Sequence, residues 1–339
     1  MLHMKIDLQA TLINIIKEKI GNEDSIGRSL ADVLSLSQDA VYRRYRGETP
    51  FNIYEIQKIC SYYGISFDSL LDIQSNRVVF NYNSLSEYDF SLDSYVDGIL
   101  DGMKRLKSYS NPKIIIAVQD TPFFQLLNFP HLFRFKMYFW AKTYLNISDF
   151  KNQQFAHQKI SEKTFNTGKE VLQIYNSIPS KEIYDLDLLR GLIRQIQYYF
   201  NAYLFQEPSY AIRLLDETLR LVNHLKAQAI VGKKFMYGTQ APASGNDFEM
   251  YLNETTNSDN TFCYKSDQKS GLYLTHNMLN YLNTSDEIYV KESEQIMEKL
   301  IANSSLISIV NEKERNSFFH QIERTITVYK QKIESDLTI

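Results

Sequence analysis

The residues best suited to recognising another molecule lie in one short segment, residues 37–46. An arginine such as Arg43 can donate two parallel hydrogen bonds to a guanine edge, and a glutamine such as Gln38 can pair similarly with adenine. A tyrosine such as Tyr42 can stack on a sugar or contact the methyl group of a thymine. These residue types predict direct reading of DNA bases. The predicted DNA-contacting residues are Arg28, Ser37, Gln38, Asp39, Tyr42, Arg43, Arg44 and Arg46.

The remaining side chains offer little catalytic chemistry. The six histidines include no pair at a metal-binding spacing, and no phosphate-binding loop, nucleophile elbow or paired-carboxylate motif occurs. The best polar cluster is His276 beside Thr275 and Asn277, for which a turn or helix cap is the more ordinary interpretation. The two cysteines, Cys60 and Cys263, have no metal-ligand spacing and form no disulfide framework. We therefore predict a protein that is not an enzyme, with no cofactor and no metal site.

Helical periodicity indicates which elements position residues 37–46. Ser37 is expected to cap a helix that runs to residue 46, and Gly47 to end it. Asn52 and Glu55 are three residues apart, the spacing of a capping box for the next helix, which Gly64 terminates. Two amphipathic helices precede these elements, and a short fifth one follows. The buried stripe of the helix after Asn52 is predicted to be Ile53, Ile56, Ile59, Cys60 and Tyr63.

The run LADVLSLSQDAVYRRYRGET, followed by IQKICSYYGISFDSLL, resembles the Cro/repressor (XRE-like) helix-turn-helix domains. The resemblance covers about residues 8–72 and implies a five-helix DNA-binding domain that usually acts as a dimer. The features that carry it are Leu30-Ala31, Leu34, Ser37, Val41, Arg46-Gly47, the Ile56/Ile59 stripe, and the closing Gly64-Ile65-Ser66-x-Asp68-x-x-Leu71.

Three positions depart from that family pattern. Gly27 or Arg28 stands where family members commonly carry a phosphate-contacting Gln. Ser35 occupies the position of the usual turn glycine, and Arg44 stands at a position that is usually apolar. We expect Tyr45 to take the buried role instead. These departures bear on the individual DNA contacts more than on the fold.

The net charge of the candidate domain argues mildly against a nucleic-acid partner. Residues 1–75 contain four Lys and four Arg against ten Asp and Glu. Binding to phosphates requires local positive charge, however, and placement therefore matters more than the sum. Three of the four arginines, Arg43, Arg44 and Arg46, lie together at the end of one predicted helix.

The whole chain has 339 residues and a net charge of −3, which suits a folded protein of two or three domains. Its N-terminus lacks the apolar run of a secretory signal, and no stretch approaches the roughly 18 apolar residues of a membrane span. With only two cysteines, a reducing compartment is expected. We predict a cytoplasmic bacterial protein without membrane contact.

We assign residues 1–75 to the helix-turn-helix domain and residues 77–339 to a mostly helical sensing or dimerisation region, with a sub-boundary near residue 150 left open. The predicted fold class is mainly α with a small β component, a five-helix bundle followed by a larger, mostly helical α+β domain. The dense aromatic residues between 123 and 140 are interpreted as core, and a ligand pocket is the minority alternative. Strands are predicted at 77–82, 113–118, 248–255, 260–264 and 271–275.

The short strand at 77–82, the helix after it and the strand at 113–118 suggest a βαβ unit. The C-terminal region also resembles the uncharacterised extensions of some bacterial helix-turn-helix proteins, a resemblance that names no ligand.

These features favour a sequence-specific transcriptional regulator that binds double-stranded DNA as an expected homodimer through a recognition helix at about 37–46. The C-terminal region would then bind a small-molecule or protein effector, support oligomerisation, or both. The alternative is an adaptor whose N-terminal bundle docks a protein partner. A third class, an enzyme with an N-terminal regulatory domain, would require a deep polar pocket with converging His and carboxylates.

Overall fold

The structure is a computed structural model of the whole chain. It divides into two compact units, residues 1–79 and residues 80–339, and residues near 150 lie inside the second unit. No helix within the described residues is long and apolar enough to cross a membrane. The residues that the structure describes are 7–20, 23–67, 70, 77–82, 91–255, 260–277 and 280–338.

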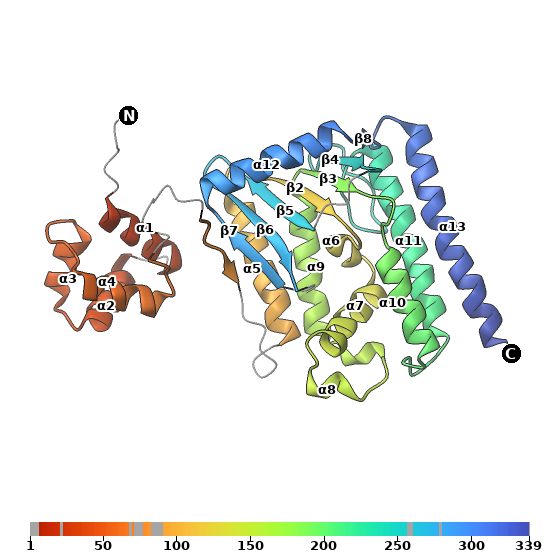
Figure 1. The fold of residues 1–339 in the computed structure, drawn as a ribbon, viewed down its shortest axis with the longest axis horizontal. Helices are drawn as coiled ribbons and strands as arrows, with labels where there is room; N and C mark the ends of the chain where they lie inside the picture. The colour runs from red at the N-terminus through yellow and green to blue at the C-terminus, as the bar shows by residue number, and fades with distance from the viewer. Residues whose placement is uncertain are drawn as a thin grey trace. The chain divides into compact units, whose positions relative to one another are not determined.

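The first unit consists, over its described residues, of four helices that enclose a small apolar core (Figure 1). The predicted fifth element falls largely on residues outside the described part of the chain. Leu12, Ile16, Leu30, Val41 and Ile59 are almost completely buried and hold the helices together. The helices are α1 (Leu8–Ile20), α2 (Glu23–Leu34), α3 (Gln38–Tyr45) and α4 (Ile53–Tyr63).

The predicted capping box at the start of α4 is confirmed: the Asn52 side chain accepts from the Glu55 backbone N–H, and the Glu55 carboxylate accepts from the Asn52 backbone N–H. Gly64 ends the helix in the left-handed conformation. The prediction that Ile53 is buried is wrong, because its side chain is 67% exposed. The core position at this end of α4 is taken by Phe51, the residue before the cap.

The second unit is built on an eight-stranded mixed sheet with the strand order β1-β7-β6-β5-β2-β3-β4-β8. The central strands β2, β3 and β4 are parallel, and every other pairing is antiparallel. The predicted small β component is therefore wrong, since the sheet is a substantial part of the fold. The strands are β1 (Asn81–Tyr82), β2 (Lys113–Val118), β3 (Ser180–Tyr184), β4 (Phe248–Leu252), β5 (Thr261–Lys265), β6 (Ser270–His276), β7 (Asn280–Thr284) and β8 (Ser305–Leu306).

The suggested βαβ unit at 77–118 does not form. β1 pairs antiparallel with β7 at one edge of the sheet, whereas β2 lies at the centre between β3 and β5. The parallel connections instead run from β2 to β3 and from β3 to β4, each through helices.

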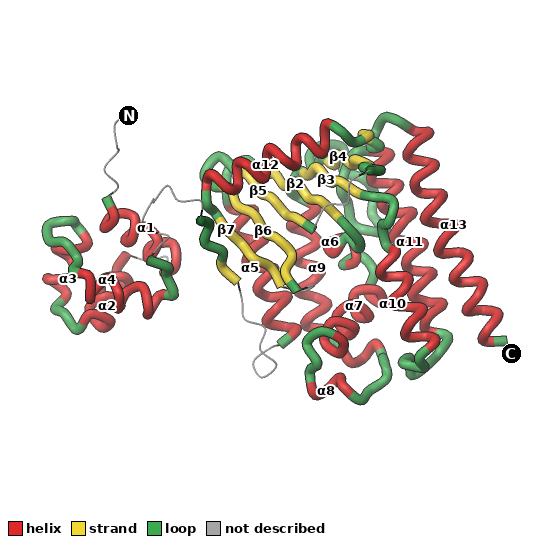
Figure 2. Tube along the Cα trace, in the orientation of Figure 1, coloured by secondary structure: helices red, strands yellow, loops and turns green. Residues whose placement is uncertain are grey.

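Helices cover both faces of this sheet, in line with the alternation of side chains along its strands. In β2, Ile114 and Val118 join the large core, whereas Ala117 joins a smaller cluster with Val290 and Met297 of α12. Figures 1 and 2 show α5 and α9 behind the strands and α12 across their front. The helices are α5 (Leu92–Ser108), α6 (Phe123–Leu126), α7 (Pro130–Thr143), α8 (Ser148–Lys151), α9 (Glu162–Asn176), α10 (Arg190–Asn201), α11 (Tyr210–Val231), α12 (Glu287–Ala302) and α13 (Glu312–Leu337), with a short 3-10 turn, η2 (His157–Lys159).

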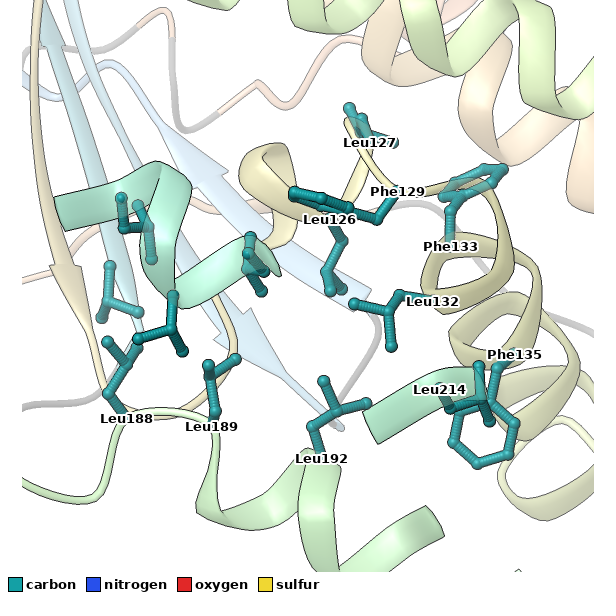
Figure 3. Close-up of a cluster of buried hydrophobic side chains, with 14 of the residues drawn as sticks. Leu126, Leu127, Phe129, Leu132, Phe133, Phe135, Leu188, Leu189, Leu192 and Leu214 are labelled. Atoms are coloured by element: carbon teal, nitrogen blue, oxygen red, sulfur yellow. The ribbon is translucent and has the colours of Figure 1, made fainter. Parts of the chain in front are cut away.

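The aromatic residues of α7 belong to this core, which confirms the core interpretation of the sequence. Phe133, Phe135 and Tyr138 are completely buried, and Tyr199 of α10 lies edge-on against Phe135. Figure 3 shows side chains of α6, α7, α10 and α11 meeting in the same cluster.

A polar group lies inside the second unit beside the sheet. Glu182 of β3 is 1% exposed, and its carboxylate accepts hydrogen bonds from Tyr175, from Ser180 at 2.9 Å and from Tyr184 at 2.6 Å. Lys234 is 0% exposed, and its ammonium lies 3.8 Å from the centre of the Tyr175 ring, with no hydrogen-bond partner among the described residues. Burial lowers the pKa of Lys234 to about 7, although the charge of Glu182 opposes the shift.

This shift predicts how stability varies with pH. Above pH 7 the folded protein holds Lys234 neutral, whereas the unfolded chain keeps it protonated up to its ordinary pKa. Unfolding then takes up a proton, so the free energy of unfolding rises with pH between 7 and 9, by up to about 1.4 kcal/mol per pH unit. Replacing Lys234 with Met removes this contribution. Urea unfolding followed through the fluorescence of Trp140, the single tryptophan, measures it.

Lys313→Met serves as the matched control, because Lys313 is exposed and its loss leaves the buried group intact. Equal pH slopes in the wild type and in Lys234→Met would contradict the assignment.

Candidate nucleic-acid interface

α2 and α3 approach each other closely because of two local features. Ser35, in the turn between them, has a left-handed backbone with φ of 56°, and the next amide, that of Leu36, bonds to the Ala31 carbonyl at 3.0 Å. A Cβ atom on Gly27 would lie 3.0 Å from the ring of Tyr42, so the absent side chain makes room for that ring. The turn is therefore tight although a serine replaces the usual glycine.

One side of α3 is buried and the other faces solvent. Val41 is completely buried, and the Ser37 hydroxyl caps the helix by accepting from the Ala40 N–H at 3.3 Å. The structure thus places four of the eight predicted contact residues together on an accessible surface, which we call the outer face of α3. Its exposed residues are Gln38, Asp39, Tyr42 and Arg43.

The charged side chains on the outer face form only a weak, solvent-exposed ion pair. Arg43 pairs with Asp39 at 3.3 Å, with the two side chains 60% and 74% exposed. Such an exposed pair contributes little to stability and is screened by salt, so the guanidinium can exchange the carboxylate for another anion at small cost. Tyr42 is less free, because its ring lies against Gly27 and is 37% exposed.

Arg44 differs from Arg43 in both burial and partner. Its guanidinium donates to both carboxylate oxygens of Glu55, at 2.9 and 3.0 Å, and to the Ala40 carbonyl at 3.1 Å. The two side chains are 16% and 13% exposed. Burial raises the pKa of Glu55, but the hydrogen bonds from Arg44 and from the Asn52 backbone, with nearby positive charge, outweigh it and leave that pKa lowered. This pair joins α3 to α4, so Arg44 is placed to orient the outer face of α3.

Arg28 and Arg46 lie outside the outer face. Arg28 is exposed on α2, and Arg46 is exposed just after α3. The Arg46 guanidinium lies 3.4 Å from the Glu48 carboxylate, again as an exposed pair. Both arginines are therefore available for long, flexible contacts of the kind that phosphates accept.

Sequence reasoning missed one residue that shapes this region, Gln9 of α1. Its amide nitrogen donates to the carbonyls of Arg44 at 2.7 Å and Thr49 at 3.0 Å, and its amide oxygen accepts from the Phe51 N–H at 2.8 Å. Three backbone groups, one in the last turn of α3 and two in the loop after it, are satisfied by this one side chain. No spacing in the sequence indicated it, since the contacts join residues 35 to 42 positions apart.

The polar residues singled out in the second unit, Thr275, His276 and Asn277, lie at the end of β6 and in the turn after it. His276 is exposed, and its ring nitrogen lies 3.0 Å from the Asn277 amide in the turn after β6. Across the part of the chain that the structure describes, no group of three or more His, Cys, Asp or Glu side chains is placed to hold a metal ion.

The segment that contains α2, α3 and α4 matches a known protein family. Residues 15–81 match the family model described as BetR domain, which is a helix-turn-helix-like DNA-binding domain associated with regulators. The match includes α2, α3 and α4 and every predicted contact residue. No curated protein and no solved structure matches the chain.

The different surroundings of Arg44 and Arg43 predict different effects of their removal. Arg44→Ala should destabilise the first unit by about 1.5–3 kcal/mol, because it leaves the half-buried Glu55 carboxylate without its charged donor. Arg43→Ala, its matched control, should change stability by less than about 0.5 kcal/mol. Hydrogen exchange of the α3 and α4 amides in the full chain measures both. Equal protection in the two variants would show that the Arg44 pair does not hold the helices.

Proposed function

We propose that this protein is a sequence-specific, DNA-binding transcriptional regulator of the XRE-like type, with α3 as its recognition helix and no enzymatic activity. The observation that carries the proposal is the outer face of α3. There Gln38 and Arg43, the residue types that bond to base edges, are exposed on a helix whose opposite side is fixed in the core. The BetR match over the same residues supports a DNA partner.

The proposed binding mode follows from these positions. α3 enters the major groove, where Gln38 and Arg43 meet base edges, and Arg28 and Arg46 contact phosphates on either side. Arg44 remains paired with Glu55 and keeps α3 at its angle to α4. A homodimer would present two such helices to half-sites roughly 34 Å apart.

Two carboxylates modify this mode. Asp39 lies on the outer face beside Arg43, and Glu48 lies beside Arg46. Each would repel phosphates, and Asp39 can also accept a hydrogen bond from the amino group of a cytosine. The first unit should therefore bind non-specific DNA weakly and depend on base contacts for its affinity.

The second candidate function is a protein-docking adaptor. It is favoured by exposed apolar side chains on α4, where Ile53, Tyr54 and Tyr62 are 67%, 74% and 67% exposed. Exposed apolar groups of this kind often mark contacts with other proteins. The two functions differ in salt dependence, because only DNA binding loses affinity in proportion to the number of phosphates neutralised.

The proposal is tested by binding the full chain to a genomic fragment library that includes its own promoter region, at two salt concentrations. Arg43→Ala and Gln38→Ala should each lower affinity for the selected fragments by about 5- to 150-fold, as the loss of one bidentate base contact predicts. Arg28→Ala and Arg46→Ala should weaken binding to all sequences equally and reduce the salt dependence.

Lys58→Ala removes one exposed positive charge from α4 and should leave selectivity unchanged. Folded wild-type protein that shows no sequence preference and no salt dependence would rule out the regulator and favour the adaptor.

A further inference from the structure

A groove in the second unit is lined by two exposed arginines. It has a volume of about 450 Å³ and lies along α11, with one residue contributed by the start of α7. A volume of this order accommodates a small metabolite. The residues that line it are His131, Ser209, Ile212, Arg213, Asp216, Glu217 and Arg220.

Two arginines dominate the groove. Arg213 and Arg220 are seven residues apart on α11, so they lie on one side of the helix, about 10 Å apart along its axis. Both are exposed, and within the described residues neither guanidinium has a salt bridge or a hydrogen bond. Arg213 only lies over the ring of Tyr210, 5.3 Å from its centre.

The two acidic residues of the groove, Asp216 and Glu217, already accept hydrogen bonds from groups of the protein. Asp216 is bonded to Lys330 of α13 at 2.6 Å. Glu217 is 5% exposed, and one of its oxygens accepts from the backbone N–H groups of His131 and Leu132, each at 3.0 Å. Glu217 thus fixes the start of α7 against α11, and these helix-terminal N–H groups are not available to a ligand.

His131 reports the resulting electrostatic environment. Burial lowers the pKa of its imidazole, and the positive charges of Arg213, His157, Arg134 and Arg220 lower it further. Its ring nitrogen bonds to the Tyr210 hydroxyl, which holds the imidazole at the rim of the groove. The charges of Arg213 and Arg220 also oppose the rise that burial causes in the pKa of Glu217, so this carboxylate balances part of their charge. The hydrogen-bond donors of both guanidinium groups nevertheless remain unused within the described residues.

We propose that this groove binds a small anionic metabolite through a phosphate or carboxylate group held by Arg213 and Arg220, with His131 and Ser209 as further hydrogen-bonding partners. Guanidinium groups suit both kinds of anion because they donate two parallel hydrogen bonds. The role of this groove as an effector site rests on the proposed regulatory function. Anion binding itself is independent of DNA and is measured without it.

The test is a titration of the full-length protein with inorganic phosphate, and separately with succinate, at an ionic strength held constant with sodium chloride. Calorimetry should show saturable binding of at least one of the two anions, and the ¹H–¹³C resonances of His131 should shift with the same saturation curve. Succinate binding without phosphate binding identifies a carboxylate ligand, and the reverse identifies a phosphate. If neither anion differs from chloride, the proposal is overturned, whatever the DNA experiments show.

Variants locate the site. Arg213→Gln and Arg220→Gln should each weaken binding by about tenfold or more, because each removes a charge-assisted hydrogen bond. Neither guanidinium has a salt bridge or hydrogen bond within the described residues, so the fold should tolerate both changes. Arg194→Gln, an equally exposed arginine on α10, is the matched control and should bind as the wild type does. Undiminished binding in the Arg213→Gln/Arg220→Gln double variant would show adventitious ion binding only and overturn the assignment.

Discussion

A helix of eight residues is too short to be stable by itself in water, and α3 has this length. Its presence and its direction must therefore come from contacts with the rest of the first unit. Val41 supplies the buried anchor, Ser37 caps one end, and the Arg44–Glu55 pair joins the helix to α4. Gln9 fixes the loop that follows, through three backbone hydrogen bonds. These contacts fix the inner side and both ends of α3, and they thereby fix the direction in which its outer face points.

Burial separates the roles of residues that look alike in sequence. Arg43 and Arg44 are adjacent and each pairs with a carboxylate, yet one pair is mostly exposed and the other mostly buried. Breaking an exposed pair costs little, whereas breaking a half-buried bidentate pair leaves a carboxylate without its donor. In the proposed DNA complex, a phosphate or base would compete for Arg43 but not readily for Arg44. This difference in the free energy of breaking each pair assigns Arg43 a proposed contact role and Arg44 a structural role.

The parts of the fold that sequence reasoning captured are set by local chemistry. The capping box at Asn52 and Glu55 depends on residues three apart, and the left-handed cap at Gly64 depends on the residue itself. The failures involve distant partners. Periodicity alone placed Ile53 in the core, although Phe51 occupies that position.

Strand β3 was missed for a similar reason. Its sequence, Ser180–Tyr184, has a glutamate at the centre and no continuous apolar run. That Glu182 can be buried because hydroxyl groups from Tyr175, Ser180 and Tyr184 satisfy it, a condition that pattern reasoning does not detect. The sequence does not predict β3, β7 or β8, and the predicted β component is therefore smaller than the observed sheet.

The same criterion, whether a polar group is satisfied within the fold, distinguishes the two charged regions of the second unit. Glu182 is buried, and its carboxylate accepts hydrogen bonds from the side chains packed around it. Arg213 and Arg220 are exposed, and within the described residues neither guanidinium has a salt bridge or a hydrogen bond. Their removal would cost the fold little, so folding does not require two arginines one above the other on α11 beside His131. The proposed anionic ligand would use the hydrogen-bond donors that these two arginines leave unused.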